Sequence, residues 1–196
     1  MQGKTLATLT ALMFASQAFA AQGDLLVRGR LIQIAPDVST SGALRSLDVD
    51  VNDQVVPELD FTYMVTDRLG VELILGTARH KIKAGDTSLG KVSHLPPTLT
   101  LQYHFAPNAV FRPYIGAGVN YTRFYDVDLP GLRIDRDSFG ASLQIGADYA
   151  INDDWFVNVD LKKLYIETDV STDSGTDLGA LKIDPLVFGV GVGMRF

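Results

Sequence analysis

The stretch LVFGVGVGMRF, residues 186–196, alternates with a period of two. Its even positions, from Leu186 to Phe196, are all apolar, while its odd positions hold three glycines, Val187 and Arg195. Successive side chains of a β-strand point to opposite faces, so one face would be wholly apolar and the other nearly bare. As an edge strand in water this segment would invite aggregation. As a strand that closes a barrel in a lipid bilayer it would be stable.

Seven further segments alternate in the same way. They span residues 24–35, 55–65, 69–78, 97–105, 112–125, 138–149 and 155–166. A tilted strand needs roughly 9–11 residues to cross a membrane, which suits these lengths. An even number of strands lets every neighbour pair antiparallel and leaves no open edge. The sequence therefore predicts an all-β fold, an eight-stranded antiparallel transmembrane β-barrel with short periplasmic turns and long extracellular loops.

Alternation alone does not decide which face points outward, because a soluble lipocalin-like barrel would bury the apolar face in its lumen. Three features favour lipid. The connections alternate between long and short, as in outer-membrane barrels. The polar phase carries charges such as Asp60 and Glu72 in mid-strand, which would cost a few kcal/mol each if they faced lipid. Aromatic residues gather on the apolar phase near the short turns, as in an interfacial girdle. They are Phe61, Tyr63, Tyr103, Phe105, Tyr149, Trp155 and Phe196.

The N-terminal segment has the three parts of a secretory signal in the right order. Lys4 supplies the positive charge, residues 6–14 (LATLTALMF) form a short apolar core, and Ala18-Phe19-Ala20 is an A-x-A cleavage site. We therefore expect residues 1–20 to be a signal peptide and residues 21–196 to form a single barrel domain. This barrel would lie in the outer membrane of a Gram-negative bacterium.

Composition excludes several classes of function. The net charge of −6 and the pI of about 4.9 argue against a nucleic-acid partner, which needs clustered cations. The chain has no cysteine, so it has no disulfide, thiolate metal site or cysteine nucleophile. His80 and His94 are expected to be a solvated pair in the second long loop rather than metal ligands. No nucleophile-elbow motif occurs, so we expect no catalytic residues, no cofactor and no enzymatic activity.

The inward phase divides by height into two sets. The lower set predicts a polar, charge-paired plug, and the upper set predicts an apolar cup that could be a substrate channel. Because eight strands enclose barely enough space for side chains, we expect no water-filled pore for large solutes. The cup residues could also simply fill the top of the barrel. The plug residues are Arg28, Arg30, Asp60, Glu72, His104, Asp148, Asp160 and Arg195, and the channel residues are Ile32, Ile34, Val56, Ile74, Phe124, Leu164 and Ile166.

A guest that cannot pass the plug could leave through the wall into the bilayer, where an apolar molecule is stable. Such an exit needs a local gap in strand pairing. Proline cannot donate to the ladder, so Pro57, Pro96 and Pro97, which flank the second long loop, are candidates for a lateral gate.

Two internal stretches, LPPTLTLQYHF at 95–105 and PYIGAGVNYTRF at 113–124, resemble the OmpW/AlkL family of small outer-membrane β-barrel proteins. LGVE at 69–72 and the terminal GVGMRF are similar as well. The resemblance implies a barrel that assists passive uptake of small hydrophobic molecules, with a hydrophobic channel and lateral release. Phe196 is similar to the terminal signal that the barrel-assembly machinery reads. The partners implied are outer-membrane lipid, small hydrophobic solutes and that machinery, and we expect a monomer.

Two kinds of function stay open from the sequence. One is a passive channel for small apolar solutes. The other is a structural or receptor barrel whose extracellular loops bind a phage, a bacteriocin or a host partner. The apolar cup favours the channel.

Overall fold

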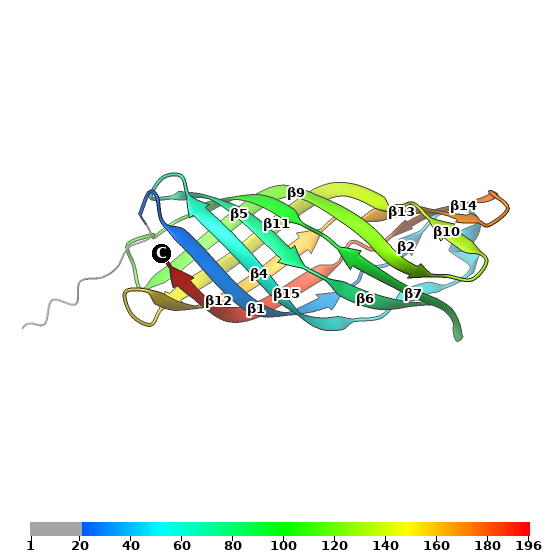
Figure 1. The fold of residues 1–196 in the computed structure, drawn as a ribbon, viewed down its shortest axis with the longest axis horizontal. Coiled ribbons are helices and arrows are strands. Elements are labelled where there is room, and N and C mark those ends of the chain that lie inside the picture. Colours follow the sequence, from blue (N-terminus) through cyan, green and yellow to red (C-terminus); the bar gives the residue numbers. More distant parts are fainter. Residues whose placement is uncertain (1–20) are drawn as a thin grey trace, which may run out of the picture.

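The computed structural model describes residues 21–196, so the predicted signal peptide at 1–20 lies outside the described residues. Eight long strands close into an antiparallel barrel in the order β11-β12-β15-β1-β4-β5-β8-β9, and β9 pairs back onto β11. This confirms the predicted fold class (Figure 1). The strands are β1 (Leu25–Ala35), β4 (Gln54–Met64), β5 (Leu69–Gly76), β8 (Thr98–His104), β9 (Phe111–Asp128), β11 (Asp137–Ala150), β12 (Trp155–Leu164) and β15 (Leu186–Arg195).

The described residues contain one short helical segment, the 3-10 helix η1 (Gly42–Ser46). Among residues 21–196, no helix is long and apolar enough to cross a membrane.

The seam between β1 and β15 closes the barrel, and its glycines are what make the closure fit. Arg28 lies opposite Gly193, and Arg30 lies opposite Gly191. A Cβ atom on Gly191 would approach Arg30 Cα and Cγ to 2.7 Å and would press on the carbonyl oxygen of Gly29. The bare face of the last strand therefore leaves room for two arginine side chains inside the barrel.

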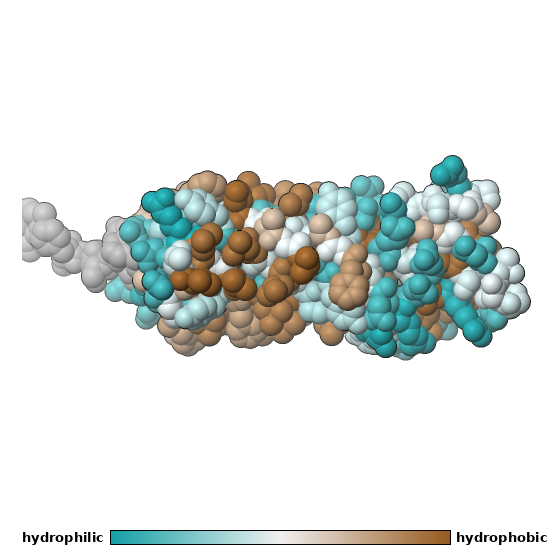
Figure 2. Space-filling model, turned by 90° about the horizontal axis from the view of Figure 1, so that it is seen from above, coloured by the Kyte–Doolittle hydropathy of each residue, from teal (hydrophilic) through white to brown (hydrophobic). Residues whose placement is uncertain are grey.

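The outer wall carries a continuous apolar band. Phe188 and Val190 are 49% and 47% exposed, so the apolar face of β15 points outward as predicted. Figure 2 shows this hydrophobic band on one face of the barrel, with hydrophilic side chains at the short-turn end and over much of the opposite half of that face. A soluble monomer does not expose apolar surface on this scale, so the band faces lipid. Aromatic side chains at its short-turn end, exposed as a girdle requires, include Tyr63, Phe105, Tyr149, Trp155 and Phe196.

The long extracellular stretches, expected as loops, instead form further strands beyond the band. The β6–β7 hairpin continues β5 and β8 outward, and β7 also pairs with β9. Alternation did not predict β6, because His80 stands at an inward position between the buried Ala78 and Ile82. An alternating strand would carry an apolar residue there. The predicted segment 155–166 corresponds to β12, which ends at Leu164, and β13 begins just beyond it in a stretch expected as a loop. The bounds are β2 (Ser39–Thr40), β3 (Val49–Val51), β6 (Ala78–Ala84), β7 (Thr87–Leu95), β10 (Leu132–Ile134), β13 (Glu167–Thr172) and β14 (Asp177–Lys182).

Two features orient the molecule. Strands β2, β10, β13 and β14 form a separate four-stranded sheet. Figure 1 shows this sheet at the end opposite the C-terminus, which lies beside the short turns. The interior of the barrel therefore opens toward an extracellular extension built from strands.

Substituting Gly191 tests the closing seam. Gly191→Val should lower the folded fraction of the barrel severely, because the new side chain meets the backbone of β1 rather than a flexible group. The measurement is the fraction of protein that keeps the folded electrophoretic mobility in sodium dodecyl sulfate without heating. Val190→Leu is the control, since Val190 faces lipid and its substitution should leave the folded fraction unchanged. Equal folding of Gly191→Val and the wild type would contradict the seam geometry.

Candidate channel and polar plug

The barrel interior is layered from the periplasmic end upward. Leu26, Met64 and Phe156 form a small buried apolar cluster near the short turns. A plug of buried charged and polar side chains lies above it, and an apolar chamber lies above the plug. Each layer comes from the inward phase of the same strands, so its composition follows from position along the strand.

Arg28 of β1 holds the plug together across the lumen. Its Nη1 donates to Asp60 Oδ1 at 2.9 Å and to Thr62 Oγ1 at 2.7 Å. Its Nε and Nη2 bind both carboxylate oxygens of Asp148 at 3.2 and 3.0 Å, in the bidentate geometry that strengthens such pairs. Arg28 and Asp60 are fully buried and Asp148 is nearly so. One guanidinium therefore ties β1 to β4 and to β11 on the far wall.

Arg30, one step higher, binds a second group of carboxylates. Its Nη2 lies 2.6 Å from Asp60 Oδ2 and 3.2 Å from Glu72 Oε1, and its Nε lies 3.0 Å from Glu58 Oε1. Its Nη1 lies 3.4 Å from Asp160 Oδ1. Asp60, Glu72, Asp148 and Asp160 of the predicted plug set therefore surround the two arginines, together with Glu58.

Sequence reasoning missed three members of this layer. Lys162 lies 2.6 Å from Glu58 Oε1, and this pair forms the floor of the chamber. Tyr114 is fully buried, and its hydroxyl donates to Asp160 Oδ2 at 3.0 Å. Lys162 and Glu58 do stand on the inward phase of their strands, but their meeting depends on the position of β12 relative to β4 across the lumen, which alternation does not reveal.

Two residues assigned to the plug lie at its margins. His104 is fully buried, and its Nε2 lies 3.1 Å from Gln102 Oε1. Arg195 lies near the periplasmic end, where its Nη1 is 3.6 Å from Asp24 Oδ2, and both side chains are about a fifth exposed.

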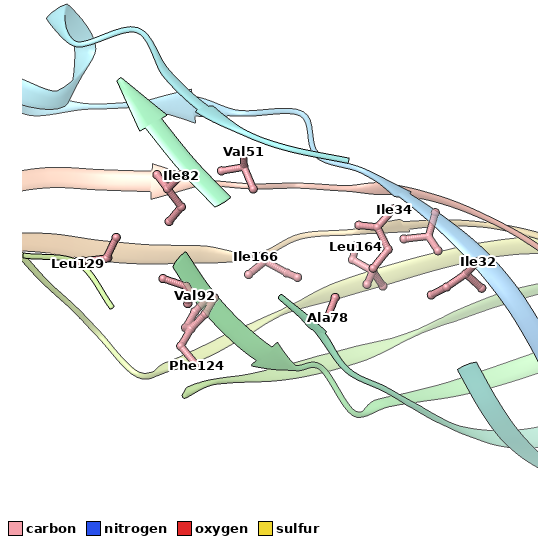
Figure 3. Close-up of a cluster of buried hydrophobic side chains, with 11 residues drawn as sticks. Ile32, Ile34, Val51, Ala78, Ile82, Val92, Phe124, Leu129, Leu164 and Ile166 are labelled. Atoms are coloured by element: carbon pink, nitrogen blue, oxygen red, sulfur yellow. The ribbon is translucent and has the colours of Figure 1, made fainter. Parts of the chain in front are cut away.

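The chamber above the plug consists of two adjoining compartments that share Ile34, His94 and Pro185. Each has a cavity volume of about 30 Å³, so side chains must move for a guest to occupy it. Figure 3 shows the apolar side chains of this region converging from several strands, among them Ile32, Phe124 and Leu164. The lower compartment is lined by Ile32, Ile34, Val56, Ile74 and Leu164 of the predicted channel set, and the upper one by Ile34, Phe124 and Ile166.

The histidine pair was expected to be solvated, and that prediction is wrong. His80 is 6% exposed and His94 is 7% exposed, with their ring centroids 5.1 Å apart. The hairpin that carries them continues the barrel wall, and its even positions, which include His80 and His94, face the chamber. Burial lowers the pKa of both imidazoles, which lie in the extracellular extension, and both are therefore neutral at pH 7.

The wall has a break at the level of the lower compartment. The β5–β8 ladder ends at Ile74↔Thr98, and the β6–β7 ladder begins at Ala78↔His94, four residues further along each strand. Both ladders have the same register, yet no pairing joins residues 75–77 to 95–97 between them. On the other side of the same segment the wall is closed, because Tyr121 N donates to the Pro97 carbonyl at 3.0 Å.

The three candidate gate prolines have different places around this break. His104 N donates to the Arg68 carbonyl on the β5 side, and residues that face β5 recur at every second position. The shared register therefore places Pro96, which has no N–H, opposite Gly76, while Pro97 faces β9. The Pro96 carbonyl accepts hydrogen bonds from Thr98 Oγ1 and Asn120 Nδ2. Pro57 is exposed on β4, one residue beyond the Glu58↔Gly76 pair that ends the β4–β5 ladder. Gly76 and Pro96 both line the lower compartment, so the break adjoins the chamber.

These features define the class: a small outer-membrane β-barrel with a closed polar plug. The sequence profile of the OmpW family matches residues 21–196. Outer membrane protein W of Escherichia coli is 38% identical over 200 residues, covering 94% of each chain. The chain therefore belongs to the OmpW family and lies in the outer membrane.

Further comparisons agree with this assignment. The dibenzothiophene metabolism operon protein PahQ of Pseudomonas aeruginosa is 32% identical over 93% of each chain. The crystal structure of OprG from Pseudomonas aeruginosa has a TM-score of 0.78 at 32% identity, covering 91% of this chain and 98% of that one. The structure of AlkL in lipid bilayers has a TM-score of 0.73 at 23% identity, covering 100% and 97%, which shows the common fold.

Removing Arg28 tests the plug. Arg28→Leu removes the arginine partner of the buried Asp148 and one of the two arginine partners of Asp60, and breaking a buried ion pair in this way costs about 3–5 kcal/mol of unfolding free energy. The measurement is urea unfolding in lipid vesicles, followed by the fluorescence of Trp155, the only tryptophan. The matched control is Arg133→Leu, which removes an exposed pair with Asp173 and should change little. Equal midpoints for the two variants would contradict the structural role of the plug.

Proposed function

We propose that this protein is a channel for passive uptake of small hydrophobic molecules, which enter the chamber from outside and leave sideways into the bilayer. The observation that carries the proposal is the wall break beside Pro96, which adjoins an apolar chamber directly above a sealed plug. Such a route has three requirements: an apolar site, a blocked axial path and a lateral opening.

The chamber suits an apolar guest. Its lining is mainly aliphatic, and transfer of apolar surface out of water is worth about 25 cal/mol per Å². The upper compartment is walled in part by β6 and β7, strands outside the apolar band. Movement of this hairpin would widen the compartment while the membrane-spanning ladders stay paired.

The plug opposes an axial path. A solute moving straight toward the periplasm would have to separate Arg28 and Arg30 from carboxylates at 2.6–3.0 Å in a site without solvent exposure. Leaving a buried charge without its partner costs several kcal/mol, and an apolar solute offers nothing in exchange. A sideways path requires no such separation and ends in hydrocarbon, where the solute is stable.

The family relationship supports the same class of solute. A relative that is 32% identical over most of its length is named for an operon of dibenzothiophene metabolism. Dibenzothiophene is a flat apolar molecule, so a membrane protein in that setting fits the uptake of hydrophobic compounds. The receptor alternative has no comparable support, since the extracellular sheet buries its own apolar residues Leu44, Val170 and Leu181.

Restoring the missing backbone donor tests lateral release. Pro96→Val supplies an N–H aimed at β5, and one such hydrogen bond is worth about 0.5–1.5 kcal/mol. This should reduce the open fraction of the wall, and with it the initial rate of hydrocarbon uptake, by roughly two- to tenfold. The measurement is uptake of naphthalene by cells that produce the wild type, a variant or no protein. Pro97→Val is the comparison, and it should reduce uptake less because its N–H would face β9.

The outcomes separate the parts of the proposal. If Pro96→Val takes up naphthalene as fast as the wild type, and both exceed cells without the protein, the lateral route is wrong and the channel function stands. If the wild type gives no increase over cells without the protein, the channel function is wrong and the receptor alternative gains.

A further inference from the structure

His94 occupies the neck between the two compartments of the chamber. It lines both of them, and its side chain is nearly fully buried. Its ring is stacked on Phe124 with centroids 6.4 Å apart and an interplanar angle of 24°. A guest that passes from the upper to the lower compartment must therefore pass this imidazole.

Both ring nitrogens of His94 are buried, and neither has a hydrogen-bond partner among residues 21–196. His80 differs, because its Nδ1 donates to the carbonyl oxygen of Asn52 at 2.7 Å. Burial, with a smaller contribution from the neighbouring His80, lowers the pKa of His94 to about 3. The ring is therefore neutral at pH 7, with one nitrogen that donates and one that accepts.

A buried polar group without a partner is unfavourable, so a guest that pairs with it gains affinity. A hydroxyl group matches a neutral imidazole because it both donates and accepts. A carboxylate does not, because burying its charge in an apolar site is costly. The charged residues that line the two compartments, Glu58 and Lys162, already pair with each other at 2.6 Å and offer no free cation.

We propose that His94 is a specificity-determining residue that makes the channel favour neutral alcohols and phenols with an apolar body over bare hydrocarbons of the same shape. This inference rests on the proposed uptake function and names its preferred solute class. The apolar body would lie against the aliphatic lining, and the hydroxyl would bind the His94 ring at the neck.

The test compares naphthalene with 1-naphthol, which differ by one hydroxyl group, in cells that produce the full chain. His94→Phe keeps an aromatic ring beside Phe124 and removes both nitrogens. It should lower the ratio of 1-naphthol to naphthalene uptake by roughly two- to tenfold, the worth of one hydrogen bond. His94→Gln keeps a donor and an acceptor and should restore most of the ratio. Val92→Ala changes the space of the upper compartment without a polar group, so it should change both rates together.

The possible results test the selectivity and the uptake function separately. An unchanged ratio in His94→Phe, with uptake above that of cells lacking the protein, overturns the selectivity and leaves the uptake function standing. Uptake of neither solute by the wild type overturns the uptake function itself. If His94→Phe does not fold, the wild type alone gives the answer by nitrogen NMR in lipid bilayers. 1-Naphthol should then shift the imidazole nitrogens of His94 and naphthalene should not, and the absence of that difference overturns the proposal.

Discussion

A backbone N–H inside a bilayer has no water to bond, and the eight barrel strands meet that constraint along most of the wall. It requires the sheet to close, and closure requires β15 to fit against β1. The glycine face of β15 makes the fit possible, because Gly191 and Gly193 leave the space that Arg30 and Arg28 occupy. The glycines that let the wall close are thus also the residues that leave room for charged side chains in the lumen.

The buried charges make the lower lumen a polar plug. The two arginines from β1 meet carboxylates from four other strands, so the plug ties the walls together and fills the cross-section. A narrow barrel with such a base is closed at its lower end, and its upper part holds the two small apolar compartments. The place where the pairing rule is relaxed, beside Pro96, lies just above that base.

The sequence predicted the membrane-spanning part well because a two-residue period reports both the strand and its two faces. The chamber-lining residues such as Ile32 and Leu164 follow from that period together with height along the strand. The extracellular strands did not follow, because a polar residue at an inward position, His80, breaks the pattern that identifies a strand. The burial of His94 and the Lys162–Glu58 pair depend on how distant strands are placed across the lumen, which the pattern of one strand does not contain.

The register on the two sides of the wall break is the same, since Ala78↔His94 continues the pairing of Ile74↔Thr98. The shear of a barrel, and with it the strand tilt and diameter, depends on register summed around the wall. A break caused by an absent donor leaves that sum unchanged, whereas an inserted residue would alter it. The break beside Pro96 therefore interrupts the pairing at one level of the wall while the strand tilt and circumference of the barrel stay the same.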